Sequence, residues 1–381
     1  MATKQIICMN GGVGETSYAN NSSQQRRVLS EVMPLLEESL KSLYCTITPN
    51  CWKVGDLGCS SGPNALLVVS EIMDIIGAAK FCSLNSDHEA PISFQIFLND
   101  LPENDFNVIF NSLSSFYTKQ LDNPRDNKRS EFGRCFINGS PGSFYGRLFP
   151  DNSMHFFHSC YSIHWRSQVP EELAGEVAPV INKGNIYAAK TSPPAVHKAY
   201  LEQFQKDFKI FLRSRSEELV PGGAMVLTFL GRLADPEFKT FWEITGMALH
   251  DMVLENLIEE EKLDSFNIPV YCPTAKEVEQ VIEAEGSFTL TRMECFNMDW
   301  YAGMYKSDNE DSAKHFNEQK KGKFVADHVR AVLEPLLKPH FGEAIMDDLF
   351  LRFATKVVHL VDVENLKLAN LTMSMTKNIG C

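Results

Sequence analysis

The sequence predicts an α/β protein in which helices cover a mostly parallel sheet. Apolar runs of strand length alternate with helical stretches over most of the 381 residues. Strands that are buried on both faces read as continuous apolar runs, and strand–helix alternation is typical of parallel sheets. The second observation concerns residues 238–281, where a helical, aromatic and methionine-rich sequence interrupts the alternation of strands and helices. Together these observations predict an α/β core that carries a helical cap.

Each element follows from its own local pattern. Apolar runs predict strands at residues 52–58, 93–100, 134–142, 153–165, 224–232, 287–296 and 369–377. Helical spacing or longer apolar stretches predict helices at residues 23–44, 65–80, 199–219, 329–342 and 343–358. The helix at 199–219 should end at Pro221-Gly222-Gly223, because proline lacks an N–H donor and glycine adopts the left-handed cap conformation. The polar stretch 306–323 is expected as an exposed loop or a poorly ordered segment.

These elements indicate a single unit over residues 1–381. The core is expected at roughly residues 50–235, with late strands near 287–297 and 369–377. The helical cap is expected from about residues 20–45, 236–282 and 325–360, three segments that are far apart along the chain.

Composition narrows the classes of partner. Lys and Arg number 36 against 49 Asp and Glu, a net charge of -13, which argues against nucleic acid as a partner. No apolar run reaches the ~18 residues of a membrane span, and the N-terminus lacks the apolar region of a signal peptide. The ten cysteines form no CxxC pair and have no zinc-site spacing, so we expect reduced thiols in a cytoplasmic protein.

Two motifs place a carboxylate at the end of a predicted strand. In VGDLGCSSGPN, residues 54–64, Asp56 precedes a glycine turn that leads into a helix, an arrangement that suits a sulfonium cofactor. The motif matches neither GxGxxG nor a P-loop, and an ordinary strand–helix turn is the alternative. In FLNDLP, residues 97–102, Asp100 could hold a ribose diol, or could instead be a capping or turn residue. Two acidic strand ends in succession favour a nucleoside site.

Two further motifs combine aromatic and small polar residues. GSPGSFYGR, residues 139–147, offers Ser143 as a polar contact and Phe144 as a face for a purine ring, or forms a surface turn with a core aromatic. HSCYSIHW, residues 158–165, predicts either a substrate pocket or side chains that pack in the core with their polar atoms hydrogen-bonded. His164 is conceivable as a general base. Neither a Ser–His–Asp order nor a nucleophile elbow accompanies it, which disfavours a hydrolase.

These motifs together resemble the plant SABATH methyltransferases, which methylate carboxylates such as salicylate, benzoate and jasmonate or the nitrogens of xanthines. The sequence segments that carry the resemblance are MNGGVGETSYANNS, DLGCSSGPNALL, IFLNDLPENDFN, GSPGSFYGRLFP, HSCYSIHW, NKGNIY, EEEKLDSFNIPVY and VRAVLEPLL with HFGEAI. The likeness covers nearly the whole chain. It implies a Rossmann-like sheet with an α-helical cap, S-adenosylmethionine as cofactor, a small-molecule substrate and a homodimer.

The resemblance also implies residue roles at the cofactor and at a metal. The residues expected at S-adenosylmethionine are Tyr18, Asp56, Cys59, Asn64, Asp100, Leu101, Ser143 and Phe144. A magnesium site, where the family has one, would fall on Asn182, Asp264, Phe266 and Asn267. Only one of these four has a charged side chain, which is weak support because a hard divalent cation prefers several oxygen ligands.

At the substrate, the resemblance implies a carboxylate held by the neutral donors Gln25 and Trp165, which position it without a catalytic base. The aromatic box around it is expected from Tyr161, Phe241, Trp242 and Phe350, with Phe229 narrowing it and His164 beside it. The salicylate-type pattern has Met where this chain has His164, whereas benzoate- and jasmonate-type members also have His. Arg166 stands where the family usually has an apolar residue, and the sequence gives it no role.

The resemblance leaves the substrate class open between two alternatives. The amino-acid sequences of several segments resemble the xanthine-methylating branch most. In that branch the residues matching Gln25 and Trp242 are often lost, so their presence here favours a carboxylate. We favour a small planar acid, because hydrogen-bonding groups that the wrong ligand leaves unpaired dominate discrimination. A xanthine N-methyltransferase is the alternative. A binding protein that has lost turnover is a third hypothesis from another class.

Overall fold

The centre of the molecule is a seven-stranded sheet in the order β3-β2-β1-β4-β5-β7-β6. The computed structural model describes residues 7–82, 91–121, 132–174, 181–232, 239–304, 317–361 and 366–380. The strands are β1 (Cys51–Leu57), β2 (Ile92–Asp100), β3 (Phe132–Pro141), β4 (Met154–Cys160), β5 (Leu219–Leu230), β6 (Phe288–Asp299) and β7 (Lys367–Lys377). The first five pair in parallel, and β7 runs antiparallel to both of its neighbours. The mostly parallel sheet is therefore confirmed.

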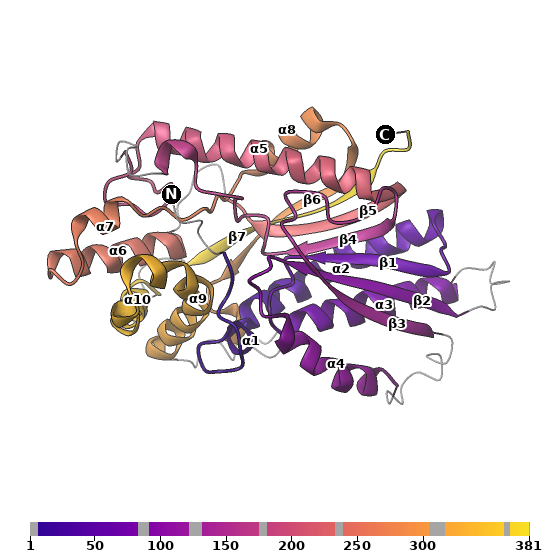
Figure 1. Cartoon of the computed structure of the whole chain (residues 1–381), viewed down its shortest axis with the longest axis horizontal. Helices are drawn as coiled ribbons and strands as arrows, with labels where there is room; N and C mark the ends of the chain where they lie inside the picture. The colour runs from indigo at the N-terminus through magenta and orange to yellow at the C-terminus, as the bar shows by residue number, and fades with distance from the viewer. Residues whose placement is uncertain are drawn as a thin grey trace.

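Helices cover both faces of this sheet (Figure 1). One face carries α2 (Ser23–Thr46), α3 (Asn64–Cys82) and α4 (Phe106–Leu121), and the other carries α5 (Pro194–Glu218) and α8 (Ala275–Glu285). Each face has its own apolar core. On the α5 face, five phenylalanines with no exposed surface pack against the strands: Phe157, Phe204, Phe208, Phe211 and Phe229. Burial of this size of aromatic surface fixes α5 on the sheet.

The remaining helices gather at one end of the sheet and form a cap (Figure 1). They are α6 (Phe241–Leu254), α7 (Glu260–Asp264), α9 (Glu318–Phe341) and α10 (Met346–Val361), and the short α1 (Tyr18–Asn21) contacts α9. A third core joins them to the carboxyl end of the sheet through Trp165 and Leu230. The start of α6 is fixed by a capping box between Thr240 and Glu243.

The helix that we expected in the cap at residues 20–45 packs on the sheet instead. Leu36, Leu40 and Leu43 of α2 share a core with Val54 of β1 and Ile96 of β2. The N-terminal part of α2 reaches the cap end of the sheet, where Val28 and Val32 pack with Met298 and Ala302. Its amphipathic pattern shows a buried face but cannot show which layer covers that face.

Three of the other differences from the predicted boundaries have a structural explanation. α5 ends at Glu218, and the Pro221-Gly222-Gly223 segment lies inside β5, where the register with β4 shifts. β4 stops at Cys160 because Tyr161 takes a positive φ of 59°. α9 already begins at Glu318, capped by the Asn317 side chain, which accepts from the Lys320 N–H at 2.9 Å. The rest of the predicted loop, residues 306–316, lies outside the described residues.

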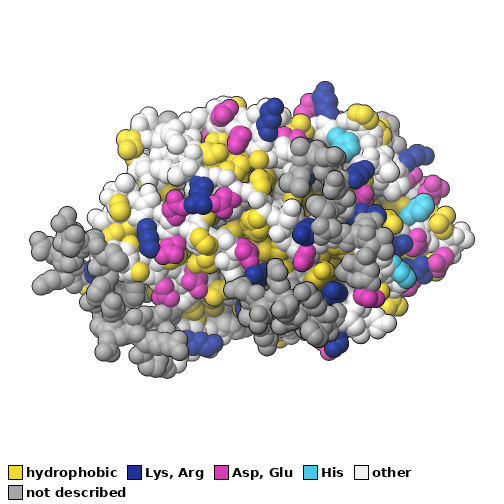
Figure 2. Space-filling model, turned by 180° about the vertical axis from the view of Figure 1, so that it is seen from behind, with side chains coloured by type: hydrophobic (Ala, Val, Ile, Leu, Met, Phe, Trp, Pro, Cys, Tyr) yellow, Lys and Arg dark blue, Asp and Glu magenta, His cyan; other side chains and the backbone are white. Residues whose placement is uncertain are grey.

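The surface mixes charges of both signs. Figure 2, which views the molecule from behind relative to Figure 1, shows basic side chains interspersed among acidic ones on the described part of this face. No described helix is long and apolar enough to cross a membrane. Eight cysteines are described in detail, and all eight are free thiols.

Candidate functional site

A cavity of about 420 Å³ lies where the carboxyl ends of β1, β2, β4 and β5 meet the cap. It brings together eleven of the residues that the sequence nominated: Tyr18, Gln25, Asp100, Leu101, Ser143, Phe144, Tyr161, His164, Trp165, Phe241 and Trp242. Crevices at the carboxyl ends of parallel strands are where ligands of this fold class bind. We call the part near Asp100, where the resemblance places the cofactor, the cofactor end, and the part near Trp165, where it places the substrate, the substrate end.

At the cofactor end, the turn after β1 is held in a conformation that needs glycine. Gly58 has a φ of 78°, and its N–H donates to the Asn99 carbonyl oxygen at 2.8 Å. A Cβ atom on Gly58 would lie 2.3 Å from the Cβ of Ser162. Ser60 also has a positive φ, 54°. Strained backbone that is tied to neighbouring strands in this way presents N–H groups and hydroxyls to a ligand at fixed positions.

Asp100 is the carboxylate of the cofactor end. Its Oδ2 accepts from the Ser60 N–H at 2.8 Å, and its Oδ1 accepts from the Leu101 N–H at 2.8 Å. Burial raises the pKa of Asp100 to about 6, although both backbone donors oppose that shift. The side chain is therefore ionised at neutral pH. Each oxygen keeps a lone pair with which it can accept from a ligand hydroxyl.

The loop that carries Ser143 and Phe144 is anchored by a buried ion pair. Arg215 donates to the carbonyl oxygens of Phe144 (2.9 Å) and Gly146 (2.8 Å), and its Nε lies 2.8 Å from Glu218 Oε2. Neither Arg215 nor Glu218 has exposed side-chain surface. A fully bonded pair of this kind makes the loop position rigid.

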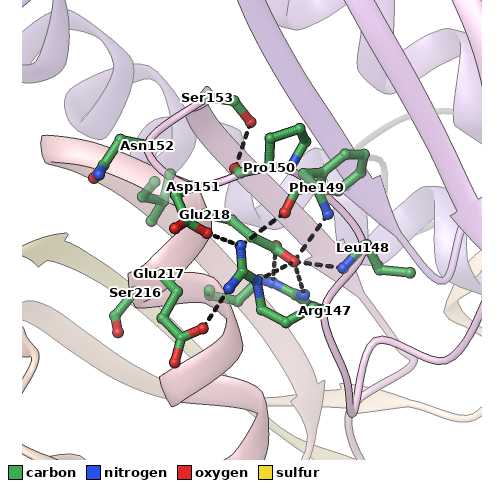
Figure 3. A network of polar contacts seen from close by, with 12 residues as sticks. Arg147, Leu148, Phe149, Pro150, Asp151, Asn152, Ser153, Ser216, Glu217 and Glu218 are labelled. Carbon is green, nitrogen blue, oxygen red and sulfur yellow. Dashed lines mark hydrogen bonds and ion pairs between the residues drawn. The ribbon is translucent and has the colours of Figure 1, made fainter.

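Around this pair lies a more exposed layer. Figure 3 shows Arg147 reaching from the same loop toward Asp151, Glu217 and Glu218. Glu218 also accepts from the backbone N–H groups of Leu148 and Phe149. Glu218 therefore connects both layers.

Three residues expected at the cofactor lie behind the turn instead of lining the cavity. The Asp56 carboxylate lies 2.8 Å from His158 Nδ1, and both are buried. Asn64 donates to the Ser22 carbonyl oxygen at 2.9 Å and so ties α3 to the start of α2. Cys59 is buried beneath the turn. These side chains brace the cofactor end.

The substrate end is aromatic. Trp165 and Trp242 meet edge to face with ring centroids 5.7 Å apart, and Tyr161 and Trp165 each lie 5.9 Å from His164. Gln25, from the first turn of α2, lines the same cavity. A flat ligand can stack among these rings, while the polar edges of Trp165 and Gln25 can donate hydrogen bonds to it.

Two neutral histidines face this end with opposite hydrogen-bonding roles. His164 Nδ1 accepts from the Leu230 N–H at 3.4 Å, so its Nε2 carries the proton and donates. His328 Nδ1 donates to the Asn21 carbonyl oxygen at 3.1 Å, so its Nε2 accepts. Burial lowers the pKa of His164 to about 3 and that of His328 to about 4. Both are therefore uncharged at neutral pH.

The sequence analysis missed His328 and its neighbours on α9. Val329 and Val332 line the cavity beside it, as do Ile7 and Met9 of the N-terminal segment. The helical spacing of residues 325, 329 and 332 signals a buried face on α9. No pattern in the sequence signals that residues 7–9 reach the cavity.

Two aromatic residues that we expected in the substrate box lie elsewhere. Phe229 points to the opposite face of the sheet, where its ring centroid is 6.3 Å from that of Phe208. Strand side chains alternate between faces, so its neighbour Leu230 lines the cavity. Phe350 is buried in the core of the cap, with the Arg330 guanidinium 5.6 Å from its ring.

The proposed magnesium ligands do not fit a divalent cation. Asn182 Oδ1 accepts from the Ser192 hydroxyl at 2.7 Å, and Asn182 Nδ2 donates to Asn267 Oδ1 at 2.8 Å. Asp264 Oδ1 accepts from the Gly184 N–H at 2.8 Å, and Phe266 is an apolar core residue. Within the described residues, no cluster of three or more His, Cys, Asp or Glu side chains could hold a metal. This group acts as a hydrogen-bonded brace between two loops.

Comparison with known proteins places the chain among methyltransferases. Residues 4–378 match the family model of SAM dependent carboxyl methyltransferases. A probable caffeine synthase of Coffea canephora is 46% identical over 384 residues, which cover 99% of this chain and 98% of that protein. The salicylate carboxymethyltransferase of Clarkia breweri is 44% identical over 383 residues, which cover 99% of each. A probable jasmonic acid carboxyl methyltransferase of Theobroma cacao is also 44% identical, over 99% of this chain and all of that protein.

A solved structure agrees with these sequences. Loganic acid methyltransferase with SAH superposes with a TM-score of 0.80 at 32% identity, over 97% of this chain and 98% of that one. The relatives include both carboxyl and xanthine methyltransferases at nearly equal identity, so they do not separate the two substrate classes. The whole-chain match and the shared fold show that this protein is an S-adenosylmethionine-dependent methyltransferase that belongs to the SAM dependent carboxyl methyltransferase family.

Proposed function

We propose that the protein transfers the methyl group of S-adenosylmethionine to a carboxylate oxygen of a small planar acid. The products are the methyl ester and S-adenosylhomocysteine. The observation that carries this proposal is the placement of Gln25 and Trp165, two neutral N–H donors, in the same cavity as the carboxylate of Asp100. Neutral donors can hold a carboxylate while leaving its oxygen nucleophilic.

The cofactor end fits a sulfonium nucleoside. Asp100 has the free lone pairs to accept from both ribose hydroxyls, and Phe144 and Ser143 border the space for the adenine. The buried hydroxyl of Ser60 has no hydrogen-bond partner within the described chain, which leaves it available to a ligand. Bound S-adenosylmethionine supplies a methyl group already activated by the positive sulfur. The chain itself must hold that nucleoside and exclude water.

The residues of the substrate end do not have to act as acids or bases in the proposed reaction. A carboxylate is ionised and nucleophilic at neutral pH, so no residue has to remove a proton. In the transfer an oxygen–carbon bond forms as the sulfur–carbon bond breaks, and the two opposite charges cancel. Trp165 and Gln25 need only orient the carboxylate, while Trp242 and Tyr161 exclude water around a flat ring.

A xanthine N-methyltransferase is the second candidate. The opposite hydrogen-bonding roles of His164 and His328 support it, because a xanthine edge presents both carbonyl oxygens and N–H groups. The same pair could equally serve a hydroxyl or ketone of an acid substrate. The positive charge of Arg166, which also lines the cavity, favours the anion.

Product analysis tests the choice. We expect protein incubated with methyl-labelled S-adenosylmethionine to label benzoate-, salicylate-, nicotinate- or jasmonate-type acids as methyl esters, as detected by mass spectrometry. Label found only in xanthine or methylxanthines would overturn the carboxylate proposal in favour of the second candidate. Absence of label from every acid and xanthine would contradict both.

A double variant tests the proposed hydrogen bonds from Gln25 and Trp165 to the substrate carboxylate. Gln25→Ala with Trp165→Phe removes two hydrogen bonds to a charged group, so we expect kcat/KM for the acid to fall by about 100-fold. Gln24→Ala with Trp52→Phe is the matched control, which should keep its kcat/KM for the acid. Gln24 bonds Asp299 and Gly303 and does not line the cavity, and Trp52 lies in the core between the sheet and α2. If Gln25→Ala with Trp165→Phe kept its kcat/KM for the acid, the proposed hydrogen bonds to the carboxylate would be wrong.

Two further properties are proposals, the first from the family resemblance and the second from cysteines that show neither CxxC nor zinc-site spacing. We infer a homodimer, which light scattering on the purified protein would show as twice the chain mass of 43.0 kDa. We also infer a cytoplasmic enzyme, which imaging of a fluorescent fusion in plant cells would test.

A further inference from the structure

Arg166 is a buried cation in the wall of the cavity. It follows Trp165 in the chain, is 1% exposed and lines the cavity. Its backbone N–H donates to the Pro269 carbonyl oxygen at 2.7 Å, and its Nη2 donates to the carbonyl oxygen of Ile163. Its Nε and Nη1 have no hydrogen-bond partner within the described residues. This is an unusual state for a guanidinium, whose donors are normally satisfied when buried.

The surroundings of Arg166 compensate its charge only in part. The guanidinium lies 5.0 Å from the ring centroid of Phe204 and 5.6 Å from that of Tyr145, so two aromatic faces stabilise it. Asp207 is buried nearby, but its oxygens accept from Ser167 and from Gln203. None of the ion pairs that the described residues form includes Arg166.

The positive charge of Arg166 changes the electrostatic potential inside the cavity. Its positive potential contributes, after burial, to the low pKa of His164. The ring of Tyr145 lies against the guanidinium, and Trp165 and Trp242 line the same cavity; these aromatic side chains screen charge far less than water does. A cation that is only partly compensated in a weakly screened wall is costly unless a ligand brings the opposite charge. The substrate end is therefore built for an anion.

We propose that Arg166 makes the substrate end selective for anionic substrates, by placing positive potential behind the carboxylate that Gln25 and Trp165 hold. The inference rests on the proposed function and adds the residue that sets the charge class of the substrate. Arg166 does not have to touch the reacting atoms, because a Coulomb interaction in a poorly screened cavity acts over several ångströms. A neutral xanthine gains nothing from this potential.

This role predicts a particular kinetic signature. Methyl transfer from a sulfonium to a carboxylate cancels charge, so the carboxylate is more negative in the ground state than in the transition state. Arg166 therefore stabilises the bound acid more than it stabilises the transition state, and its loss should raise KM without lowering kcat. A merely structural role would lower kcat, or would weaken the binding of neutral ligands as well.

The test compares Arg166→Met and Arg166→Lys with the wild type. Methionine keeps the length of the stem and removes the charge, and lysine keeps the charge. For Arg166→Met we expect KM for the acid to rise by about tenfold or more, with kcat within about twofold. Affinity for the neutral primary amide of the same acid should stay within about twofold of wild type. The Tm should not fall, because an unpaired buried charge is removed. Arg166→Lys should restore most of the KM.

The control is Arg292→Met, which also removes one positive charge but lies on the surface beside Glu38 and Glu294. It should leave KM unchanged. An unchanged KM for the acid in Arg166→Met, or equal losses of acid and amide binding, would overturn the inference while acid turnover by the wild type upholds the proposed function. Failure of the wild type to methylate any acid would instead overturn the proposed function.

Discussion

The two ends of the cavity are built from different parts of the chain. The cofactor end consists largely of backbone after consecutive strands, where Gly58 bonds Asn99 and Asp100 bonds Ser60. The substrate end consists of side chains from α2, α6, α9 and the loop after β4, elements that are far apart in the sequence. Backbone geometry tolerates few substitutions, whereas side chains on separate helices can change one at a time. If the two ends bind as proposed, this difference would let one fold keep its cofactor while its substrate changes.

The largest expected effect comes from filling the glycine turn. In Gly58→Ala the new Cβ meets Ser162 at 2.3 Å and the residue keeps an unfavourable φ of 78°, so the turn must shift. We expect affinity for S-adenosylhomocysteine to fall by about 100-fold or more, measured by equilibrium dialysis.

The control for this change is Gly286→Ala. Gly286 has a φ of 85° at the C-terminal cap of α8, and a Cβ atom added there would have no neighbour within 4 Å among the described residues. It should lose stability of about 1 kcal/mol and keep its cofactor affinity. Equal affinities for Gly58→Ala and wild type would show that this turn does not approach the cofactor.

Asp100→Asn should have the next largest effect. It keeps the shape of the side chain but removes the charge that would accept from ribose hydroxyls. We expect cofactor affinity to fall by about 30-fold, as for charge-assisted hydrogen bonds elsewhere. A thermal-shift titration with S-adenosylhomocysteine measures this, and an unchanged midpoint concentration would place the ribose elsewhere.

The two ends should also differ in their response to pH. Because the pKa of Asp100 is raised to about 6, lowering the pH through 6 protonates it and weakens cofactor binding, by up to tenfold per pH unit. His164 and His328 have pKa values lowered to about 3 and about 4, so they stay neutral and add no transition above pH 5.

Steady-state kinetics separate these contributions. Between pH 6 and 8.5, kcat at saturating cofactor should vary by no more than about twofold. KM for the cofactor should rise on the acidic side of pH 6. A transition in kcat with an apparent pKa of 6 to 7 would indicate an ionising histidine at the substrate end.

The smallest effect is expected at the rim of the cofactor end. Arg147 is 37% exposed, and its ion pairs with Asp151 and Glu217 are in contact with solvent. Exposed pairs contribute about 1 kcal/mol or less, so Arg147→Ala should change the Tm and cofactor affinity only slightly. Arg215→Met is the contrasting variant, since it removes the buried support of the Phe144 loop. If both variants were equally damaging, the anchoring role would belong to the whole network.

Several residues that the sequence nominated for the cofactor line one cavity in the structure, because they are local in the sequence. The glycine turn, Asp100 and the Ser143-Phe144 loop each occupy one short motif at a strand end, and parallel strands bring such ends together. Sequence reasoning could not show that Asp56 turns inward to His158, since side-chain direction at the end of a strand depends on the neighbouring strand.

The substrate end was predicted less completely. Its residues come from elements whose packing the sequence does not reveal, so Phe229 was placed in the box although strand alternation turns it to the opposite face. His328 was missed because a helical stripe shows burial but not the partner across it. The position of α2 on the sheet was missed for the same reason.

Calorimetry with two successive ligands examines the shared cavity itself. S-adenosylhomocysteine titrated into wild-type protein should bind once per chain, and an acid substrate titrated into that complex should then bind beside it without displacing it. Absence of heat in the first titration, or release of the nucleoside in the second, would contradict a single cavity that holds the sulfonium donor and the carboxylate together.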